Sequence, residues 1–98
     1  MCGIAGIMIR GDASPENAVL ERMAQALRHR GPDGSGMHVA RNVGMVQTRL
    51  AIIDLETGDQ PLYEPGGAAL VANGEIYNYL ELRATLPQVD FATGSDCE

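Results

Sequence analysis

The spacing of hydrophobic residues changes several times along the chain, and the first segment is a short apolar run. Residues 2–9 read "CGIAGIMI", with Gly3 and Gly6 set among aliphatic side chains. Glycine inside an apolar run is typical of a buried strand that another part of the backbone approaches closely. We therefore predict a buried strand at the start of the chain.

The next segment has the spacing of a helix. Its apolar residues recur every three or four positions and form one stripe: Val19, Leu20, Met23, Ala24 and Leu27. Ser14 suits the N-cap, and Pro15 suits the first helical position. The basic residues 28–30 suit the negative end of the helix dipole, and Gly31-Pro32 ends the predicted helix.

Extended spacing returns in residues 36–55, "GMHVARNVGMVQTRLAIIDL". This stretch predicts two strands joined by a turn at Arg41-Asn42, with residues 51–54 beginning another extended segment. A loop dense in turn-forming residues follows, and we expect a hairpin tip at residues 65–67.

The segment "AALVANG" predicts a buried strand that ends at Asn73-Gly74, a pair that readily adopts positive φ. Residues 75–86 predict a helix that Pro87 ends, and residues 88–94 predict a short strand. The last residues, "SDCE", match a capping box, with Ser95 as N-cap and Glu98 three residues later. Because a capping box announces a helix, we expect this chain to be a fragment of a longer protein.

Composition narrows the function classes. The 98 residues suit one small domain, and the formal net charge of −6 argues against nucleic acid or an anionic membrane as a partner. No apolar run approaches the roughly 20 residues of a membrane span, and no basic segment precedes an apolar one as in a signal peptide. With only two cysteines, at opposite ends of the sequence, a reducing cytoplasm is the expected compartment.

Cys2 is the first candidate for chemistry. Methionine aminopeptidases remove Met1 when the next side chain is small, which would leave Cys2 with a free α-amino group. The reference pKa values are about 7.7–8.0 for that amine and about 8.5 for the thiol, so the amine suits the role of base for its own nucleophile. The alternative is a small apolar residue that begins a strand. Cys97 is expected to be a buried structural thiol.

Asn73 and Gly74 are candidates for an oxyanion hole, because a side-chain amide and an adjacent glycine N–H offer two donors to one developing charge. The alternative is an ordinary turn. Asp96 is a candidate partner for an ammonium group, although an acidic residue at a helix N-terminus is a common structural role.

Arg49 interrupts an apolar run and must therefore be paired or reach solvent. Its planar guanidinium suits a ligand carboxylate. The alternative is a salt bridge to Asp54 or Glu56. Together, an arginine, an aspartate, an oxyanion pair and a nucleophile suit an α-amino acid with a reactive side-chain carbonyl.

Two other site types are rejected. The segment "RHRGPDGSG" lacks the spacing of a P-loop and follows a predicted helix where a P-loop would follow a strand. His29 and His38, with two distant cysteines, match no familiar metal-ligand spacing, so a zinc site is not expected.

The motifs, taken in order, resemble one family. They are "MCGIAGI", "RHRGPDGSG", "RLAIIDLETGDQPL", "NGEIYN" and "TGSDCE". This set resembles the front part of the class II glutamine amidotransferase domain of glutamine-hydrolysing asparagine synthetases and covers essentially all of residues 1–98. The forms of the second and fourth motifs favour this branch over glucosamine-6-phosphate synthase and the purine-pathway amidotransferase. The stretch "VQTRL" departs from the family's more usual histidine-containing form, but Arg49 is retained.

The resemblance implies an α+β fold, the αββα sandwich of N-terminal nucleophile hydrolases, present here only as its N-terminal half. It implies that Cys2 attacks the side-chain amide of L-glutamine, that a thioester forms, and that glutamate and ammonia are released. Asn73 and Gly74 would form the oxyanion hole.

The same resemblance implies the remaining substrate contacts. Arg49 would bind the α-carboxylate of glutamine, while Asp96 and Glu75 would receive its α-amino group. Backbone atoms around Ile52 and Ile53 would line the pocket.

The resemblance also implies a missing C-terminal synthetase domain, or a complementing chain, that uses ATP and magnesium to convert aspartate to asparagine. No cofactor or metal is expected in residues 1–98 themselves, which would form a partial amidotransferase domain. With open sheet edges, the 98-residue chain alone is expected to be inactive. A homodimeric parent enzyme is left open.

Two alternatives to this enzyme are retained. One is a non-catalytic remnant that binds glutamine or a partner chain. The other is a class II amidotransferase with a different acceptor, such as a β-lactam-forming relative; such relatives often lose the catalytic cysteine, which is present here.

Overall fold

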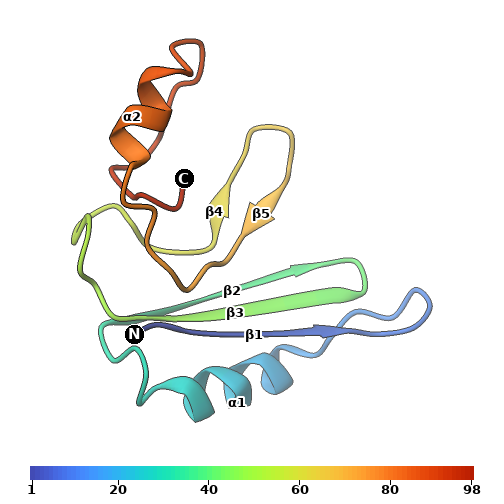
Figure 1. Cartoon of the computed structure of the whole chain (residues 1–98). Helices are drawn as coiled ribbons and strands as arrows, with labels where there is room; N and C mark the ends of the chain where they lie inside the picture. The colour runs from blue at the N-terminus through green and yellow to red at the C-terminus, as the bar shows by residue number, and fades with distance from the viewer.

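Three strands form an antiparallel sheet in the order β1-β3-β2 in the computed structural model, which describes residues 1–98. A separate two-stranded hairpin pairs β4 with β5. The elements along the chain are β1 (Gly3–Met8), α1 (Asn17–Leu27), β2 (Gly34–Ala40), β3 (Val43–Arg49), β4 (Leu62–Tyr63), β5 (Ala69–Leu70) and α2 (Tyr79–Ala84). The fold is therefore α+β. Helix α1 lies along one face of the sheet, while the hairpin and α2 lie on the other side (Figure 1).

The core sits between α1 and the central strand β3. Leu20 of α1 and Val46 of β3 are fully buried. Gly44 provides the space for this contact, because a Cβ there would lie 2.8 Å from Cδ2 of Leu20. Near the other end of the helix, the Thr48 hydroxyl donates to the carbonyl of Leu27 (3.1 Å). Side chains alternate along a strand, so even-numbered residues of β3 face α1 and odd-numbered residues face away.

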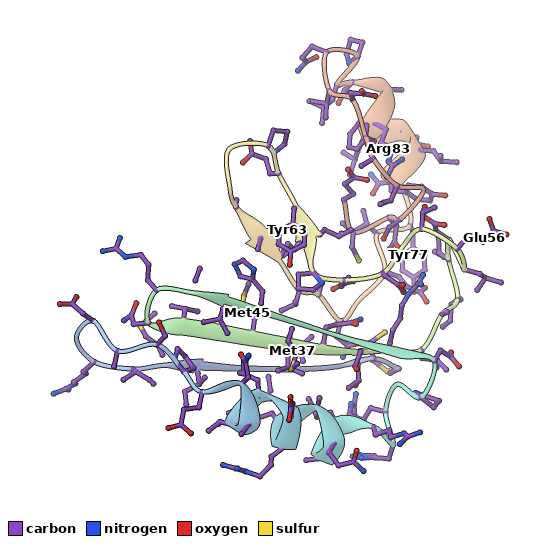
Figure 2. The ribbon with its side chains drawn as sticks, turned by 180° about the vertical axis from the view of Figure 1, so that it is seen from behind. Met37, Met45, Glu56, Tyr63, Tyr77 and Arg83 are labelled. Carbon is purple, nitrogen blue, oxygen red and sulfur yellow. The ribbon has the colours of Figure 1, made fainter.

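The second face of the sheet supports the hairpin. His38 of β2, opposite Met45 in the register, packs edge-on against Tyr63 of β4, with ring centroids 5.4 Å apart. Figure 2 shows Met45 on the hairpin side of the sheet and Met37 on the side of α1. A Cβ at Gly36 would lie 1.7 Å from the carbonyl oxygen of Gln60, so the loop before β4 rests directly on β2.

Several predicted elements are confirmed. Strand β1 begins the chain, but it is not buried as predicted: it lies at the edge of the sheet, only Gly3 is buried, and Ile4 and Met8 are 49% and 74% exposed. Strands β2 and β3 are joined at Arg41-Asn42, where Arg41 adopts a φ of 53°. The hairpin tip also falls where it was predicted: the Gly67 N–H donates to the Glu64 carbonyl (2.9 Å), and Gly67 has a φ of 100°.

The predicted start of the first helix is wrong. The N-cap residue is Glu16, whose backbone is extended and whose side chain makes no capping hydrogen bond. Pro15 therefore precedes the helix, and Ser14 does not cap it. Residues 28–30 lie beyond the last helical residue, so they are not in its final turn.

The other extended segments mostly lack partners. Residues 51–54 and 88–94 form no strand. The predicted strand before Asn73-Gly74 shrinks to Ala69–Leu70, and Leu70 is 47% exposed. A strand requires a neighbour to satisfy its backbone groups, and residues 51–54 and 88–94 have none in residues 1–98.

Three local predictions near the C-terminus also change. Neither Asn73 nor Gly74 has a positive φ. The second helix is limited to Tyr79–Ala84 and has no buried residue. The capping box is only half formed: Ser95 Oγ accepts from the Cys97 N–H (3.2 Å), but the Glu98 carboxylate turns to the Thr93 N–H (2.7 Å) instead of reaching back to Ser95. No helix has the length and apolar character needed to cross a membrane.

Candidate active site

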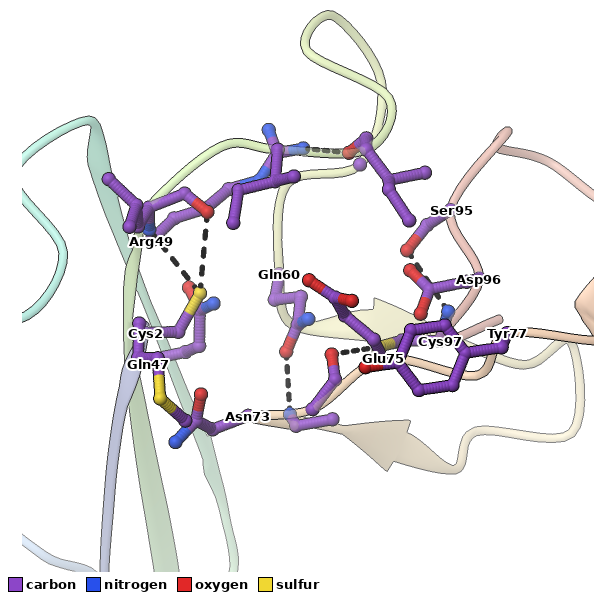
Figure 3. Close-up of a pocket in the computed structure, with 17 residues that line it drawn as sticks. Cys2, Gln47, Arg49, Gln60, Asn73, Glu75, Tyr77, Ser95, Asp96 and Cys97 are labelled. Atoms are coloured by element: carbon purple, nitrogen blue, oxygen red, sulfur yellow. Dashed lines mark hydrogen bonds between the residues drawn. The ribbon is translucent and has the colours of Figure 1, made fainter.

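A cavity of about 270 Å³ lies beside the end of the sheet where β1 begins and β3 ends (Figure 3). Its walls come from segments far apart in the sequence. All the predicted site residues line it: Cys2, Arg49, Ile52, Ile53, Asn73, Gly74, Glu75 and Asp96. The fold thus gathers residues from both ends of the chain, from Cys2 to Asp96.

Cys2 is held at the start of β1 by the pairing of this strand with β3. The Leu50 N–H donates to Cys2 Sγ (3.3 Å), and the thiol lies 3.6 Å from the Leu50 carbonyl oxygen, to which it donates. The carbonyl of Cys2 accepts a hydrogen bond from Nε of Arg30 (3.1 Å). Cys2 is half-buried, and the two contacts with Leu50 fix the direction of its sulfur. Met1 is attached and lines the same cavity.

Arg49 ends β3 with its side chain only 8% exposed. Nη1 donates to Oδ1 of Asp59 (2.8 Å), and Nη2 donates to the carbonyls of Ile53 (3.0 Å) and Asp54. The predicted alternative of a salt bridge to Asp54 or Glu56 is wrong, because the ion pair is with Asp59 and Asp54 contributes only its carbonyl to Arg49. No hydrogen bond uses Nε or the second hydrogen of Nη1, so donors remain for a ligand.

The loop after β3 is shaped by Arg49 from one side and by Asp33 from the other. Oδ2 of Asp33 accepts from the Ala51 N–H (2.9 Å). Gly58 leaves room for the guanidinium, since a Cβ there would lie 2.6 Å from Nη2 of Arg49. Ile52 and Ile53 therefore line the cavity from an irregular loop, not from the predicted strand.

The opposite wall carries Asn73, Gly74 and Glu75. Oε1 of Gln60 accepts from the Ala72 N–H (2.6 Å) and fixes the chain just before them. The Asn73 side-chain amide and the Gly74 N–H take part in no hydrogen bond within the chain. All three residues are exposed. Asn73 and Gly74 both line the cavity that holds the Cys2 thiol, and these two donors are unused within the chain.

Asp96 is buried at the same wall, where its Oδ2 accepts from the Ile76 N–H (2.7 Å). Its loop is fastened by Arg83, which donates to the carbonyls of Thr93 (2.9 Å) and Ser95. The guanidinium of Arg83 also stacks over the ring of Phe91, 4.3 Å from its centroid. Oδ1 of Asp96 remains available for a cationic group.

Asp54 joins two walls of the cavity, a role that was not predicted. Its Oδ2 accepts from the Gly94 N–H (2.7 Å), 40 residues away. The Thr57 hydroxyl and then the Thr57 N–H, both donating to the carboxylate, lower the pKa of Asp54 below its ordinary value. Asp54 and Thr57 are three residues apart, the spacing at which an N-cap aspartate accepts from the backbone N–H, and this signal was present in the sequence.

Further cavity residues that the sequence reasoning missed include Gln47, Gln60, Tyr77, Ser95 and Cys97. Cys97 is half-buried and not fully buried as predicted. Burial, and then the neighbouring Asp96 carboxylate, raise the pKa of its thiol. No group of three or more His, Cys, Asp and Glu side chains in the chain is arranged to hold a metal ion.

Residues 1–98 match the family model for the glutamine amidotransferase domain, and the chain belongs to this family. Within it, the chain is similar to proteins named as glutamine-hydrolysing asparagine synthetases. It is 46% identical over 100 residues to one from Triphysaria versicolor and 45% identical over 101 residues to one from Zea mays. It is also 46% identical over 102 residues to asparagine synthetase 2 of Bacillus subtilis (strain 168).

These alignments cover all of this chain but a small part of each relative. The chain spans 17% of the length of the two plant proteins and 14% of the length of the bacterial one. The family predicted from the ordered motifs is confirmed.

Proposed function

We propose that this chain forms part of a glutaminase site that hydrolyses L-glutamine, with Cys2 as the nucleophile. The observation that supports this is the convergence on one cavity of a fixed thiol, two unused donors and a buried arginine. The four together match the chemical needs of amide hydrolysis on an α-amino acid.

The reaction begins once Met1 is removed. The α-amino group of Cys2 takes the thiol proton, and Sγ attacks the side-chain carbonyl carbon of glutamine. The C–N bond then breaks, and the leaving nitrogen receives the proton from the ammonium, which releases ammonia and leaves a thioester. Water attacks the thioester, the C–S bond breaks, the sulfur recovers a proton, and glutamate leaves.

Asn73 and Gly74 stabilise the oxyanion that forms when sulfur adds to the carbonyl. The Asn73 amide and the Gly74 N–H have no acceptor within the chain, so they need not give up another hydrogen bond to serve this charge. Removal of one such donor typically costs about 10²- to 10³-fold in rate.

Arg49, Asp96 and Glu75 select the α-amino acid end of the substrate. A free hydrogen of Arg49, on Nε or on Nη1, binds the α-carboxylate, and the Asp59 carboxylate orients the guanidinium without using either of them. Asp96 accepts from the α-ammonium through Oδ1 because Oδ2 is already engaged. Glu75 adds a second carboxylate, and Ile52 and Ile53 supply backbone contacts.

In the whole protein, we propose that the released ammonia reacts with aspartate. A domain outside residues 1–98 that depends on ATP and Mg²⁺ would convert the aspartate to asparagine in this way. We assign the αββα sandwich of N-terminal nucleophile hydrolases to the complete domain and place the protein in the cytoplasm. The 98-residue chain alone is expected to be inactive in turnover, because Asn73, Gly74 and Glu75 are exposed to water.

The test is an intact mass measurement after incubation with a glutamine-analogue diazoketone that alkylates the nucleophile. We expect a species that lacks Met1 and carries one adduct at Cys2, with the adduct suppressed by excess L-glutamine. The Cys97→Ser variant, as matched control, keeps the adduct, and Cys2→Ser loses it. An adduct at Cys97, or none while a small thiol reagent still reaches Cys2, would overturn the proposal.

A further inference from the structure

The side-chain amide of Gln47 is buried without a hydrogen bond. The residue is 1% exposed, and its Nε2 is a buried donor with no partner. It is the single side-chain nitrogen or oxygen in residues 1–98 with this status. Burial of an unpaired donor destabilises the folded state, so its retention calls for a partner that arrives from outside the chain.

The strand pairing directs Gln47 toward the cavity. It lies in the central strand β3, opposite Ile4 of β1 on one side and Gly36 of β2 on the other. Since Thr48 donates to the Leu27 carbonyl on the α1 side, Gln47 faces the other side, as Arg49 does. Gln47 lines the cavity together with Cys2, and Figure 3 draws the two side chains at the same end of it.

Gly36 and the loop that carries Gln60 are the neighbours of Gln47 on this face of the sheet. The residue across the ladder, Gly36, has no side chain, and the Gln60 carbonyl rests on that glycine. The Gln60 side-chain oxygen accepts from the Ala72 N–H. None of these neighbouring groups forms a hydrogen bond with Nε2 of Gln47.

We propose that Gln47 is a substrate-binding residue whose Nε2 donates a hydrogen bond to the side-chain carbonyl oxygen of the glutamine held beside Cys2. The proposal rests on the proposed function and deepens it. Gln47 and Arg49 lie two residues apart on one face of β3, about 6.6 Å along the strand, a spacing suited to the two ends of a short amino acid. Arg49 binds the carboxylate end, and Gln47 reads the amide end from the sheet, opposite Asn73.

The experiment measures ligand binding by calorimetry on the 98-residue chain in a Cys2→Ala background, which prevents turnover. The ligands are L-glutamine and L-norvaline, an amino acid of the same carbon-chain length without the side-chain carbonyl. We expect Gln47→Met to raise the Kd for L-glutamine about tenfold, the worth of one neutral hydrogen bond, and to leave the Kd for L-norvaline within twofold. Arg49→Met is the matched comparison, and it should raise the Kd for both ligands.

A second readout separates binding from a merely structural role. Because Gln47→Met removes an unpaired buried donor and keeps the side-chain length, the ligand-free variant should melt no lower than its parent. If Gln47→Met fails to fold, Gln47→Leu replaces it, since it also removes the donor and buries no charge. This variant should raise the Kd for L-glutamine more than the Kd for L-norvaline.

The outcomes are distinct. An unchanged Kd for L-glutamine, or an equal loss for both ligands, overturns this assignment while the proposed function stands. If the Cys2→Ala parent, with Gln47 intact, binds neither ligand, the proposed function fails and the role of Gln47 fails with it.

Discussion

Arg30 holds the start of β1 by donating from its Nε to the main-chain carbonyl of Cys2, 28 residues earlier (3.1 Å). Arg30 follows α1, so the helix that covers the sheet also positions the candidate nucleophile. The hydrogen bond from Arg30 fixes the main chain of Cys2 and so holds its sulfur opposite Leu50, although Arg30 does not bond to the sulfur itself.

Removal of this contact should slow chemistry at Cys2 with little loss of stability. We expect Arg30→Met to reduce the rate of diazoketone labelling about three- to tenfold, the equivalent of one hydrogen bond. Arg28→Met is the control, since the Arg28 side chain makes no hydrogen bond and is exposed. Equal rates for wild type and Arg30→Met would show that the Leu50 contacts suffice to position the sulfur.

Gly36→Ala should separate the loop before β4 from the sheet. The added Cβ would lie 1.7 Å from the Gln60 carbonyl oxygen, and backbone cannot move aside cheaply. We expect a loss of about 1–3 kcal/mol in unfolding free energy, measured by denaturant titration. Gly6→Ala is the matched change in the same sheet, because its nearest contact is an ordinary 3.5 Å. Equal stabilities for the two variants would contradict this packing.

Acid should loosen the link between the cavity walls at Asp54. Its pKa is lowered in the folded protein, so the stabilisation is present above the unfolded value near 3.8 and is lost as pH falls through the lower folded value. We expect Asp54→Asn to melt lower than wild type at pH 6 and the difference to shrink below pH 3.8. A difference that is constant from pH 6 to pH 3 would argue against ionised Asp54 as the link.

Arg83 should position Asp96 through the loop between them. Arg83→Met removes charge-assisted hydrogen bonds to the Thr93 and Ser95 carbonyls and the stacking on Phe91. We expect a loss of about 1–3 kcal/mol in stability and weaker protection of Cys2 by L-glutamine. Arg83→Lys should recover only part of both, because an ammonium cannot reproduce the planar fork. Arg10→Met, an exposed change far from the loop, serves as the control.

The parts of the fold that could be predicted are those whose signals are local. The turn at Arg41-Asn42 and the tip at residues 65–67 are marked by turn-forming residues and both appear where expected, although the positive φ of the first turn falls on Arg41 and not on Asn42. The segments 51–54 and 88–94 carry an extended pattern but no neighbouring strand, and a pattern alone cannot supply that partner.

The residues of the candidate site also fall into those that could be predicted from local signals and those that could not. The predicted residues all line one cavity. They could be predicted because each had a chemical reason or belonged to a motif. Asp54 and Gln47 were missed because their importance depends on distances across the fold: one reaches Gly94, and the other has no partner. Gln47 did leave a trace, as an amide inside an apolar run.

Met1 lines the cavity next to Cys2, and this gives N-terminal processing a second consequence. Its excision would release the α-amine and, in the same event, remove a side chain from the walls. A chain that keeps Met1 would then be a latent form, blocked in both chemistry and access. The specific activity of a preparation would track its processed fraction, so that an aminopeptidase sets the number of competent molecules.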